Sequence, residues 1–414
     1  MTMKSAVAIG IAAVLPLALG VGIGTLTANS GAELKDLAAL RSRYARTKSE
    51  IDRLRAEVAQ AGTKVSRAMP PPAKGNVPES SAVPLEVASP PSRKLDFASA
   101  MEQISKAGLH RTGLITAETI EATLEKYGRA PRFLVAAANF SEPDRSLAYL
   151  QEALEKDPGS PLALLIGVYT LLAKGDADAE TADWIERMKQ ADPSNSLPCY
   201  LAARTKMASG ELDSALREMR EASTRSFLND YHLNLLPEAA TFLREAGWSE
   251  GAARAIAFGI DRIDDLAPLR RLGEDASNGA RARLREGSRQ DALAFAQLQA
   301  QLGQRLAVSS RTLVGYLAGT ATETEALMTE KEVEETLGNR ERIDEIEKRI
   351  ENLRNGVERL KRTGEAFSAS FSRFSEAEMQ AYIERVLRDG ELQAASDLPG
   401  VKEALRGQDG EERG

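Results

Sequence analysis

Residues 161–193 read PLALLIGVYTLLAKGDADAETADWIERMKQADP and contain two apolar patterns of helical spacing joined by Gly175-Asp176. Small residues at such positions let two helices cross closely, large apolar ones fill the gap to a neighbouring unit, and proline ends the second helix. The positions concerned are Leu164, Gly167, Val168 and Leu171 in the first half, and Thr181, Ile185, Met188 and Pro193 in the second. The stretch therefore predicts a helix–turn–helix unit.

The same pattern recurs at intervals of 34 to 35 residues on both sides of this unit. The preceding unit ends in Ser146, Leu150, Ala153 and Pro158, and the following one carries Cys199, Ala202, Ala203 and Lys206, then Gly210, Ala215, Met219 and Ala222. Together they resemble the tetratricopeptide repeat (TPR), a helix–turn–helix unit of this length. The resemblance implies an α-solenoid, and we expect TPR-like helical repeats over residues 127–320.

The repeats depart from the TPR pattern at several positions. No tryptophan opens a unit, Ser141 stands at a turn glycine, Met188 replaces a small residue, and Phe227 replaces the third terminal proline. Fainter copies follow, carried by Gly247, Ala252, Ile256 and Gly259, and again by Gly287, Ala292 and Ala296. An unrelated helical bundle with alanine-rich crossings shares much of this pattern and is the alternative.

In TPR proteins the ligand usually lies against the first helices of the repeats. The resemblance, carried over by register, places the partner-binding residues at Tyr169, Tyr200, Arg204 and Met207, with Leu165 and Leu172 beside them. Tyr200 and Arg204 are one helical turn apart, so an aromatic plane and a guanidinium could face the same peptide carboxylate. The alternative is that C-terminal helices fold back into the groove and bury these residues.

The N-terminal part predicts a tethered protein. Ser5 to Thr27 contains no charged residue, and as a helix it would span roughly 35 Å, enough for a hydrocarbon core of about 30 Å. We expect a transmembrane anchor within residues 1–31, with a cleaved signal peptide as the alternative. Anchors followed by repeats are most familiar in bacterial cell envelopes. Because a span that follows Lys4 usually behaves as an export signal, we expect a single-pass protein whose C-terminal body is extracytoplasmic. The four basic residues just after the span favour a cytoplasmic body, which is the alternative.

A stalk and a spacer follow the anchor. Within residues 32–67 apolar residues recur every seventh position at Leu37, Tyr44, Ile51, Val58 and Val65. This heptad predicts a coiled-coil stalk that makes the protein a homo-oligomer, with a single amphipathic helix as the alternative. Residues 68–93 carry seven prolines, which predict a semi-extended linker.

The remaining segments also read as helices. We expect leading helices over 94–126, with Thr116 and Thr119 as candidate caps, and a coiled coil over 321–365, either intermolecular or an antiparallel hairpin on the repeats. Helices should follow over 366–406, where Phe367, Phe371 and Phe374 share one face that favours core packing, and Ser375 with Glu378 forms a capping box. Residues 407–414 predict a disordered tail.

Composition limits the function. Aromatic residues make up 5% and charged residues 28% of 414 residues, which favours an all-α fold. A formal net charge of −7 argues against nucleic acid as a partner, and one cysteine with two histidines cannot supply the usual zinc ligands. No nucleotide-binding or catalytic motif is present. We expect no catalytic residue, metal or cofactor.

These features together predict a membrane-anchored scaffold whose repeats bind a protein or peptide. The alternative is a structural or assembly component of the cell envelope that acts through its coiled coils.

Overall fold

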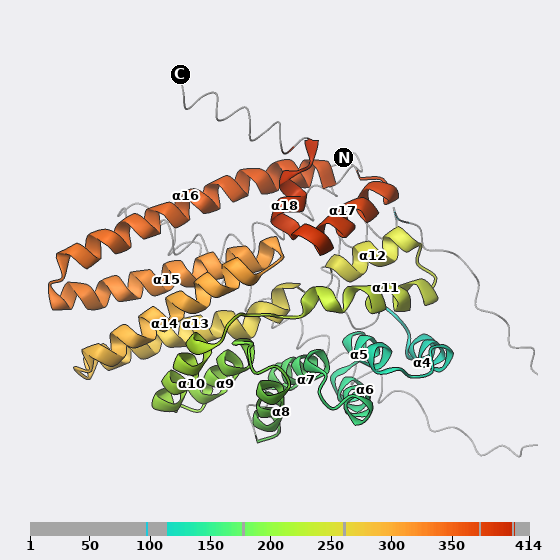
Figure 1. The fold of residues 1–414 in the computed structure, drawn as a ribbon, viewed down its shortest axis with the longest axis horizontal. Helices are drawn as coiled ribbons and strands as arrows, with labels where there is room; N and C mark the ends of the chain where they lie inside the picture. Colours follow the sequence, from blue (N-terminus) through green and yellow to red (C-terminus); the bar gives the residue numbers. More distant parts are fainter. Residues whose placement is uncertain are drawn as a thin grey trace, which may run out of the picture. The chain divides into compact units, whose positions relative to one another are not determined.

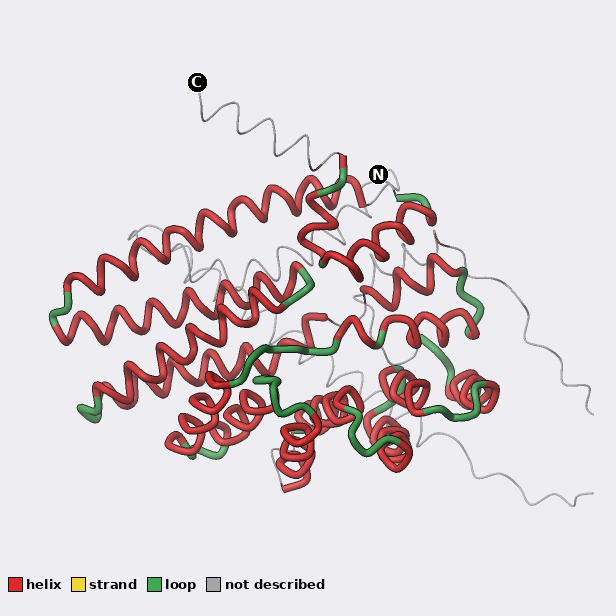
Figure 2. Tube along the Cα trace, viewed as in Figure 1, coloured by secondary structure: helices red, strands yellow, loops and turns green. Residues whose placement is uncertain are grey.

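The computed structural model describes residues 97, 114–175, 179–259, 262–371, 374–399 and 401. All of these residues belong to one compact unit. The described residues form fifteen α-helices and one short 3-10 helix, with no strand among them (Figure 2). The all-α prediction is confirmed.

Three helical hairpins follow one another where the repeats were predicted. Four of their six helices begin with proline at the first or second position, where the missing N–H costs nothing. The hairpins contact one another in chain order (Figure 1). A short helix, α4 (Ala117–Lys126), precedes them and is capped by Thr116 as predicted. The hairpins are α5 (Pro131–Asn139) with α6 (Pro143–Lys156), α7 (Pro161–Lys174) with α8 (Ala179–Ala191), and α9 (Leu197–Ala208) with α10 (Leu212–Thr224).

Small residues do allow close crossings inside these hairpins. The ring of Trp184 on α8 lies over Gly167 of α7, so closely that a Cβ at Gly167 would stand 2.0 Å from the ring. Ala215 and Ala222 of α10 are both fully buried. In the second and third hairpins, small residues therefore lie where the two helices pack closely, as the sequence pattern predicts.

After α10 the chain does not continue the stack. Residues 225–231 run back across the α8–α9 loop, where Ser196 N–H donates to the Phe227 carbonyl at 2.8 Å. The buried Asn195 side chain accepts from the N–H of Asn229 at 3.0 Å and donates to the carbonyl of the same residue at 2.9 Å. This segment redirects the chain to the opposite end of the three hairpins.

The next helices, α11 (Leu236–Glu245) and α12 (Glu250–Gly259), form a hairpin at the predicted fourth copy, but α11 packs on α5 and α4. Phe242 of α11 is fully buried. Its ring centroid lies 6.1 Å from that of Phe133 in α5 and 6.3 Å from that of Phe140, the residue that follows α5. α13 (Arg262–Arg285) then lies against α7 and α9. Figure 1 shows α11 and α13 as a second layer over the row of α5 to α10.

α14 (Arg289–Ser309) and α15 (Leu313–Leu337) cross backbone to backbone. A Cβ at Gly303 would lie 2.4 Å from the Glu323 nitrogen, and one at Gly319 would lie 2.3 Å from the Ala307 nitrogen. No side chain larger than hydrogen fits at either position. The crossing makes α13, α14 and α15 one tightly packed group.

The predicted coiled coil over 321–365 is interrupted by a turn at Gly338-Asn339. Its two halves belong to α15 and to α16 (Arg340–Phe371), which pack against each other in antiparallel fashion. Of the two alternatives, the structure shows the hairpin within the chain. Leu327, Ile346 and Ile350 form a small apolar cluster in its seam.

Two further helices, α17 (Glu376–Asp389) and α18 (Glu391–Ser396), complete the described chain. The capping box of Ser375 and Glu378 is present. Phe367 is buried and Phe374 is partly buried, and both rings lie against Tyr382 of α17, which confirms core packing for these two residues.

The predicted anchor (1–31), stalk (32–67), linker (68–93) and tail (407–414) lie outside the described residues. Within the described ranges, none of the helices combines the length and the apolar character that a membrane span requires.

Candidate functional site

The four residues predicted to bind a partner lie on α7 and α9, on the side that faces the second layer. Tyr200 has an exposed fraction of 0% and Met207 of 8%, while Tyr169 is half-buried. Arg204 forms an ion pair with Asp275 of α13, with nitrogen and oxygen 3.6 Å apart. In the structure Tyr200 and Met207 are therefore covered, and Arg204 already faces a carboxylate of its own chain.

The covering helices differ from those that the sequence suggested. The groove is occupied by α11 and α13, whereas the alternative prediction placed the C-terminal helices there. The reason is the backward course of residues 225–231, which brings α11 to α5. Recognition of a partner by Tyr169, Tyr200, Arg204 and Met207 stays a prediction, and it would require this cover to move.

Three of the ion pairs between the two layers share one polarity, whereas Arg283 of α13 with Asp213 of α10 has the reverse one. The cation stands on the first layer and the acid on the second in Lys126–Glu245 at 2.7 Å, Arg132–Glu238 at 3.9 Å and Arg204–Asp275 at 3.6 Å. The hydrogen bond from Lys126 is the main cause that holds the pKa of Glu245 below its usual value. Lys126, Arg132 and Arg204 are thus already paired with acidic residues of the same chain.

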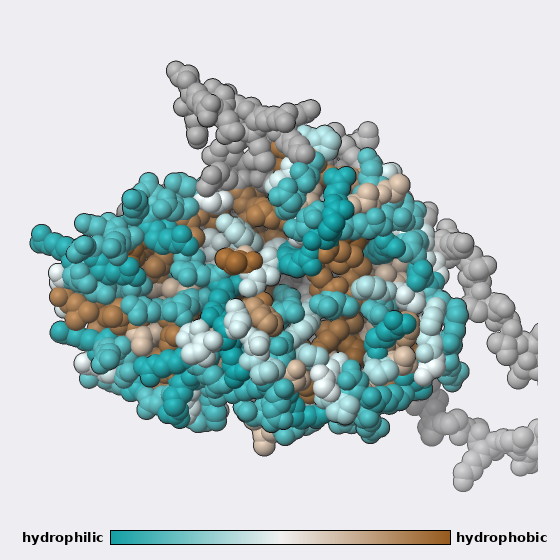
Figure 3. Space-filling view, in the orientation of Figure 1, coloured by the Kyte–Doolittle hydropathy of each residue, from teal (hydrophilic) through white to brown (hydrophobic). Residues whose placement is uncertain are grey.

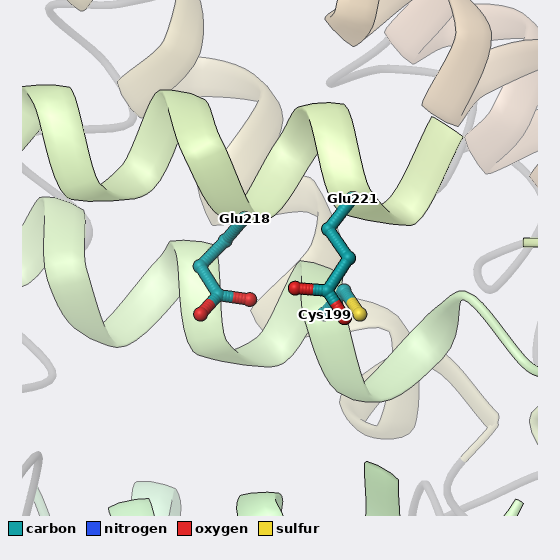
Figure 4. Close-up of side chains that lie close together, drawn as sticks. All are labelled: Cys199, Glu218 and Glu221. Atoms are coloured by element: carbon teal, nitrogen blue, oxygen red, sulfur yellow. The ribbon is translucent and has the colours of Figure 1, made fainter. Parts of the chain in front are cut away.

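A second candidate site lies between α9 and α10. Among the described residues, one group of thiol or carboxylate side chains is close enough to hold an ion: Cys199, Glu218 and Glu221, whose ligand atoms lie within 4.8 Å of one another. Figure 4 shows both carboxylates descending from α10 towards Cys199 on α9.

Cations of the protein already neutralise this group. Lys189 donates to both oxygens of Glu218, at 3.0 and 2.8 Å, and Arg225 donates to Glu221. Burial raises the pKa of the Cys199 thiol to about 11, so the thiolate that a metal needs is disfavoured. The arrangement fits the sequence interpretation of Cys199 as a small buried residue better than a metal site.

The outer side of the first two hairpins carries a shallow hollow between α6 and α8. Its lining consists of Gln151, Leu154, Glu155 and Arg187. Leu154 is buried and supplies an apolar floor, and the Arg187 guanidinium lies 5.7 Å from the centre of the Trp184 ring. Figure 3 shows that hydrophilic residues dominate the surface over α6, α8 and α10. The TPR resemblance points only to the first helices of the repeats, so it gives no signal for this hollow on the second helices.

The comparisons with known proteins give no relative. No protein-family model matches the chain, and no curated protein is significantly similar to it.

Proposed function

We propose that the protein is a membrane-anchored scaffold that binds a protein or peptide partner on the outer surface of its TPR-like hairpins. The observation that carries this proposal is the occupation of the concave face by α11 and α13. A partner then meets α6, α8 and α10. The hollow of Gln151, Leu154, Glu155 and Arg187 is the candidate contact, because it combines an apolar floor with groups of both charges.

The alternative role in envelope assembly now depends on residues 32–67. The helices of 321–365 pair with each other inside the chain, so their apolar seam is occupied. Because the helices of 321–365 and the concave face are both occupied within the described part of the chain, the outer face of α6, α8 and α10 is the candidate recognition surface.

Site-specific photo-crosslinking in the native membrane tests the proposal. A photoreactive residue at position 151 or 187 should yield adducts with the same partner, and one at the exposed Arg285 should not. Arg187→Glu should reduce the adduct formed at position 151, and Arg285→Glu should leave it unchanged. Adducts of equal yield at all three positions, or no adduct at 151 and 187, would contradict the outer-face assignment.

A further inference from the structure

Residues 340–401 form a C-terminal arm. The turn at Gly338-Asn339 is its covalent connection to the rest of the protein, which we call the body. The arm comprises α16, α17 and α18, at the top of Figure 1. Its principal contacts with the body are those of α16 with α15 and of α17 with α12. Gly338 has a φ of 71°, a left-handed conformation that glycine adopts without strain.

Two charged layers join α16 to α15. Arg349 lies 2.8 Å from Glu323, and Arg342 lies 2.9 Å from Glu330. Each glutamate is almost fully buried, with side-chain exposures of 2% and 1%, whereas the arginines are 50% and 39% exposed. The two glutamates are seven residues apart, and so are the two arginines, so both layers have the same antiparallel register.

A third helix completes each layer. Gln304 of α14 donates to Glu323 at 3.0 Å, and Gln297 donates to Glu330 at 3.4 Å. The glutamines are again seven residues apart. Polar layers inside a helical seam specify register and partner at some cost in stability, and removing one partner of a buried pair is strongly destabilising. The body therefore requires an arginine from an arm at each layer.

The arm also caps two helices of the body. The Glu376 carboxylate accepts hydrogen bonds from the Gly251 N–H at 2.7 Å and the Ser249 hydroxyl at 2.9 Å, at the start of α12. The Glu391 carboxylate accepts from the Leu313 N–H at 2.8 Å, at the start of α15. Unsatisfied N–H groups and the helix dipole make these positions favourable for carboxylates.

Apolar contacts accompany the caps. Phe258 of α12 meets Tyr382 of α17 edge to face, with ring centroids 6.0 Å apart. Leu236, Ala255 and Leu313 of the body share the same cluster with Met379, Ile383 and Val386 of the arm. The arginines, the capping carboxylates and these apolar side chains thus all come from the arm, which is covalently attached to the body at a single turn.

We propose that the arm is exchangeable, and that a second copy of this chain supplies residues 340–401 to the body of the first. Exchange reproduces each layer, cap and apolar contact between copies, and it changes only the turn. The conformation of Gly338 is needed for the closed chain alone. The exchanged arm contributes Arg342, Arg349, Glu376 and Glu391 to its partner's body.

Complementary charge variants of the full chain provide the test. Chain one carries Glu323→Arg and Glu330→Arg, and chain two carries Arg342→Glu and Arg349→Glu. Each chain alone opposes like charges in both layers, which disfavours the closed arm. Only an exchanged pair satisfies all four layers, because the body of chain one then meets the arm of chain two and the reverse.

Crosslinking reports the exchange. Lys331→Cys in chain one and Glu347→Cys in chain two place thiols where Lys331 and Glu347 form an ion pair across the seam. Cys199, the native cysteine, is fully buried. A short bismaleimide should crosslink the two chains of this mixture. The inter-chain product should be about tenfold more abundant than in a control mixture in which chain one carries Arg270→Cys in place of Lys331→Cys. Arg270 lies on α13, which is not one of the two helices of the seam, and is half exposed.

Two controls keep the result interpretable. The chain with all four charge changes has matched layers and should be folded when closed, as judged by circular dichroism. The two cysteines in otherwise native chains should give an inter-chain product that rises with protein concentration. If the fourfold variant folds, and neither mixture gives more product than its Arg270→Cys control, the arm does not exchange.

Discussion

Arg204 of α9 faces the carboxylate of Asp275 on α13, 3.6 Å away, at the position where the TPR register predicts the carboxylate of a ligand. The predicted chemistry is thus present, but the acid comes from the same chain. Tyr200, one turn earlier on α9, is fully buried. Because Tyr200 is part of the core, its substitution is expected to change the stability of the fold.

Tyr200→Ala should lower the free energy of unfolding by about 3–5 kcal/mol, as expected for loss of a fully buried aromatic side chain. Tyr200→Phe should be neutral or stabilising, because the hydroxyl is buried and has no hydrogen-bond partner in the described part of the chain. Urea denaturation of both variants measures the difference. A Tyr200→Phe variant destabilised by more than about 1 kcal/mol would reveal a partner for the hydroxyl.

Gly303→Ala should destabilise the protein by about 1–3 kcal/mol or more, because the new methyl group would meet the backbone of α15. Gly356→Ala is the matched control. Its methyl group would have only the Tyr316 hydroxyl nearby, at 3.8 Å, and alanine is favoured over glycine in a helix by about 1 kcal/mol. Thermal melting should therefore move in opposite directions for the two variants, and equal shifts would contradict the backbone crossing.

Glu152 should make stability dependent on acid pH. The hydrogen bond from Arg129 is the main cause that lowers its pKa from 4.5 to about 2. A carboxyl group whose pKa is lowered by folding stabilises the fold at pH values above its pKa in the unfolded chain. This stabilisation is lost as the pH falls towards its pKa in the folded protein. Glu152→Gln should cost about 1–2 kcal/mol at pH 7, allowing for solvent screening, and progressively less between pH 4.5 and 2.

Asp144 is the control for this prediction. It pairs with Lys174, but its side chain is 93% exposed. Asp144→Asn should change stability by no more than about 0.5 kcal/mol at any of these pH values. Denaturant titrations at several pH values compare the two variants, and a constant cost of Glu152→Gln down to pH 2 would contradict the assignment.

Cys199 should react with iodoacetamide only as fast as the protein opens. The thiol is fully buried, and burial raises its pKa to about 11, so little thiolate exists near neutral pH. Alkylation followed by mass spectrometry should speed up in parallel with unfolding in urea. Added Zn²⁺ should leave the melting temperature unchanged; an increase would instead show that Cys199, Glu218 and Glu221 can bind the ion.

The local structure was largely accessible from the sequence. Gly175 and Gly210 end the first helices of their hairpins, Thr116 caps α4, and Ser375 with Glu378 caps α17, because these effects depend on residues within one turn. Contacts between segments that are far apart in the sequence were harder to predict. The apolar face of α11 that carries Phe242 would suit stacking on α10 as well as packing on α5, since periodicity defines a face but not what covers it.

The candidate site illustrates the same limit. Tyr200 and Arg204 were correctly placed on one face of one helix, yet Asp275 lies 71 residues from Arg204 in the chain, and no spacing rule connects them. The replacement of the third terminal proline by Phe227 was the available signal, because it marks the segment where the chain turns back. The charged layers of α14, α15 and α16 were also detectable as three pairs of residues with heptad spacing.

The return of the chain at residues 225–231 also bears on how this architecture can change over time. An open superhelix lengthens or shortens by duplication or loss of a unit, because each unit contacts only its neighbours. Here Phe242 must reach Phe133 and Phe140 at the far end of the row, and α13 must span α7 and α9. A fourth hairpin inserted after α10 would separate these surfaces. A change in the number of stacked hairpins would therefore require compensating changes in the positions of α11 and α13.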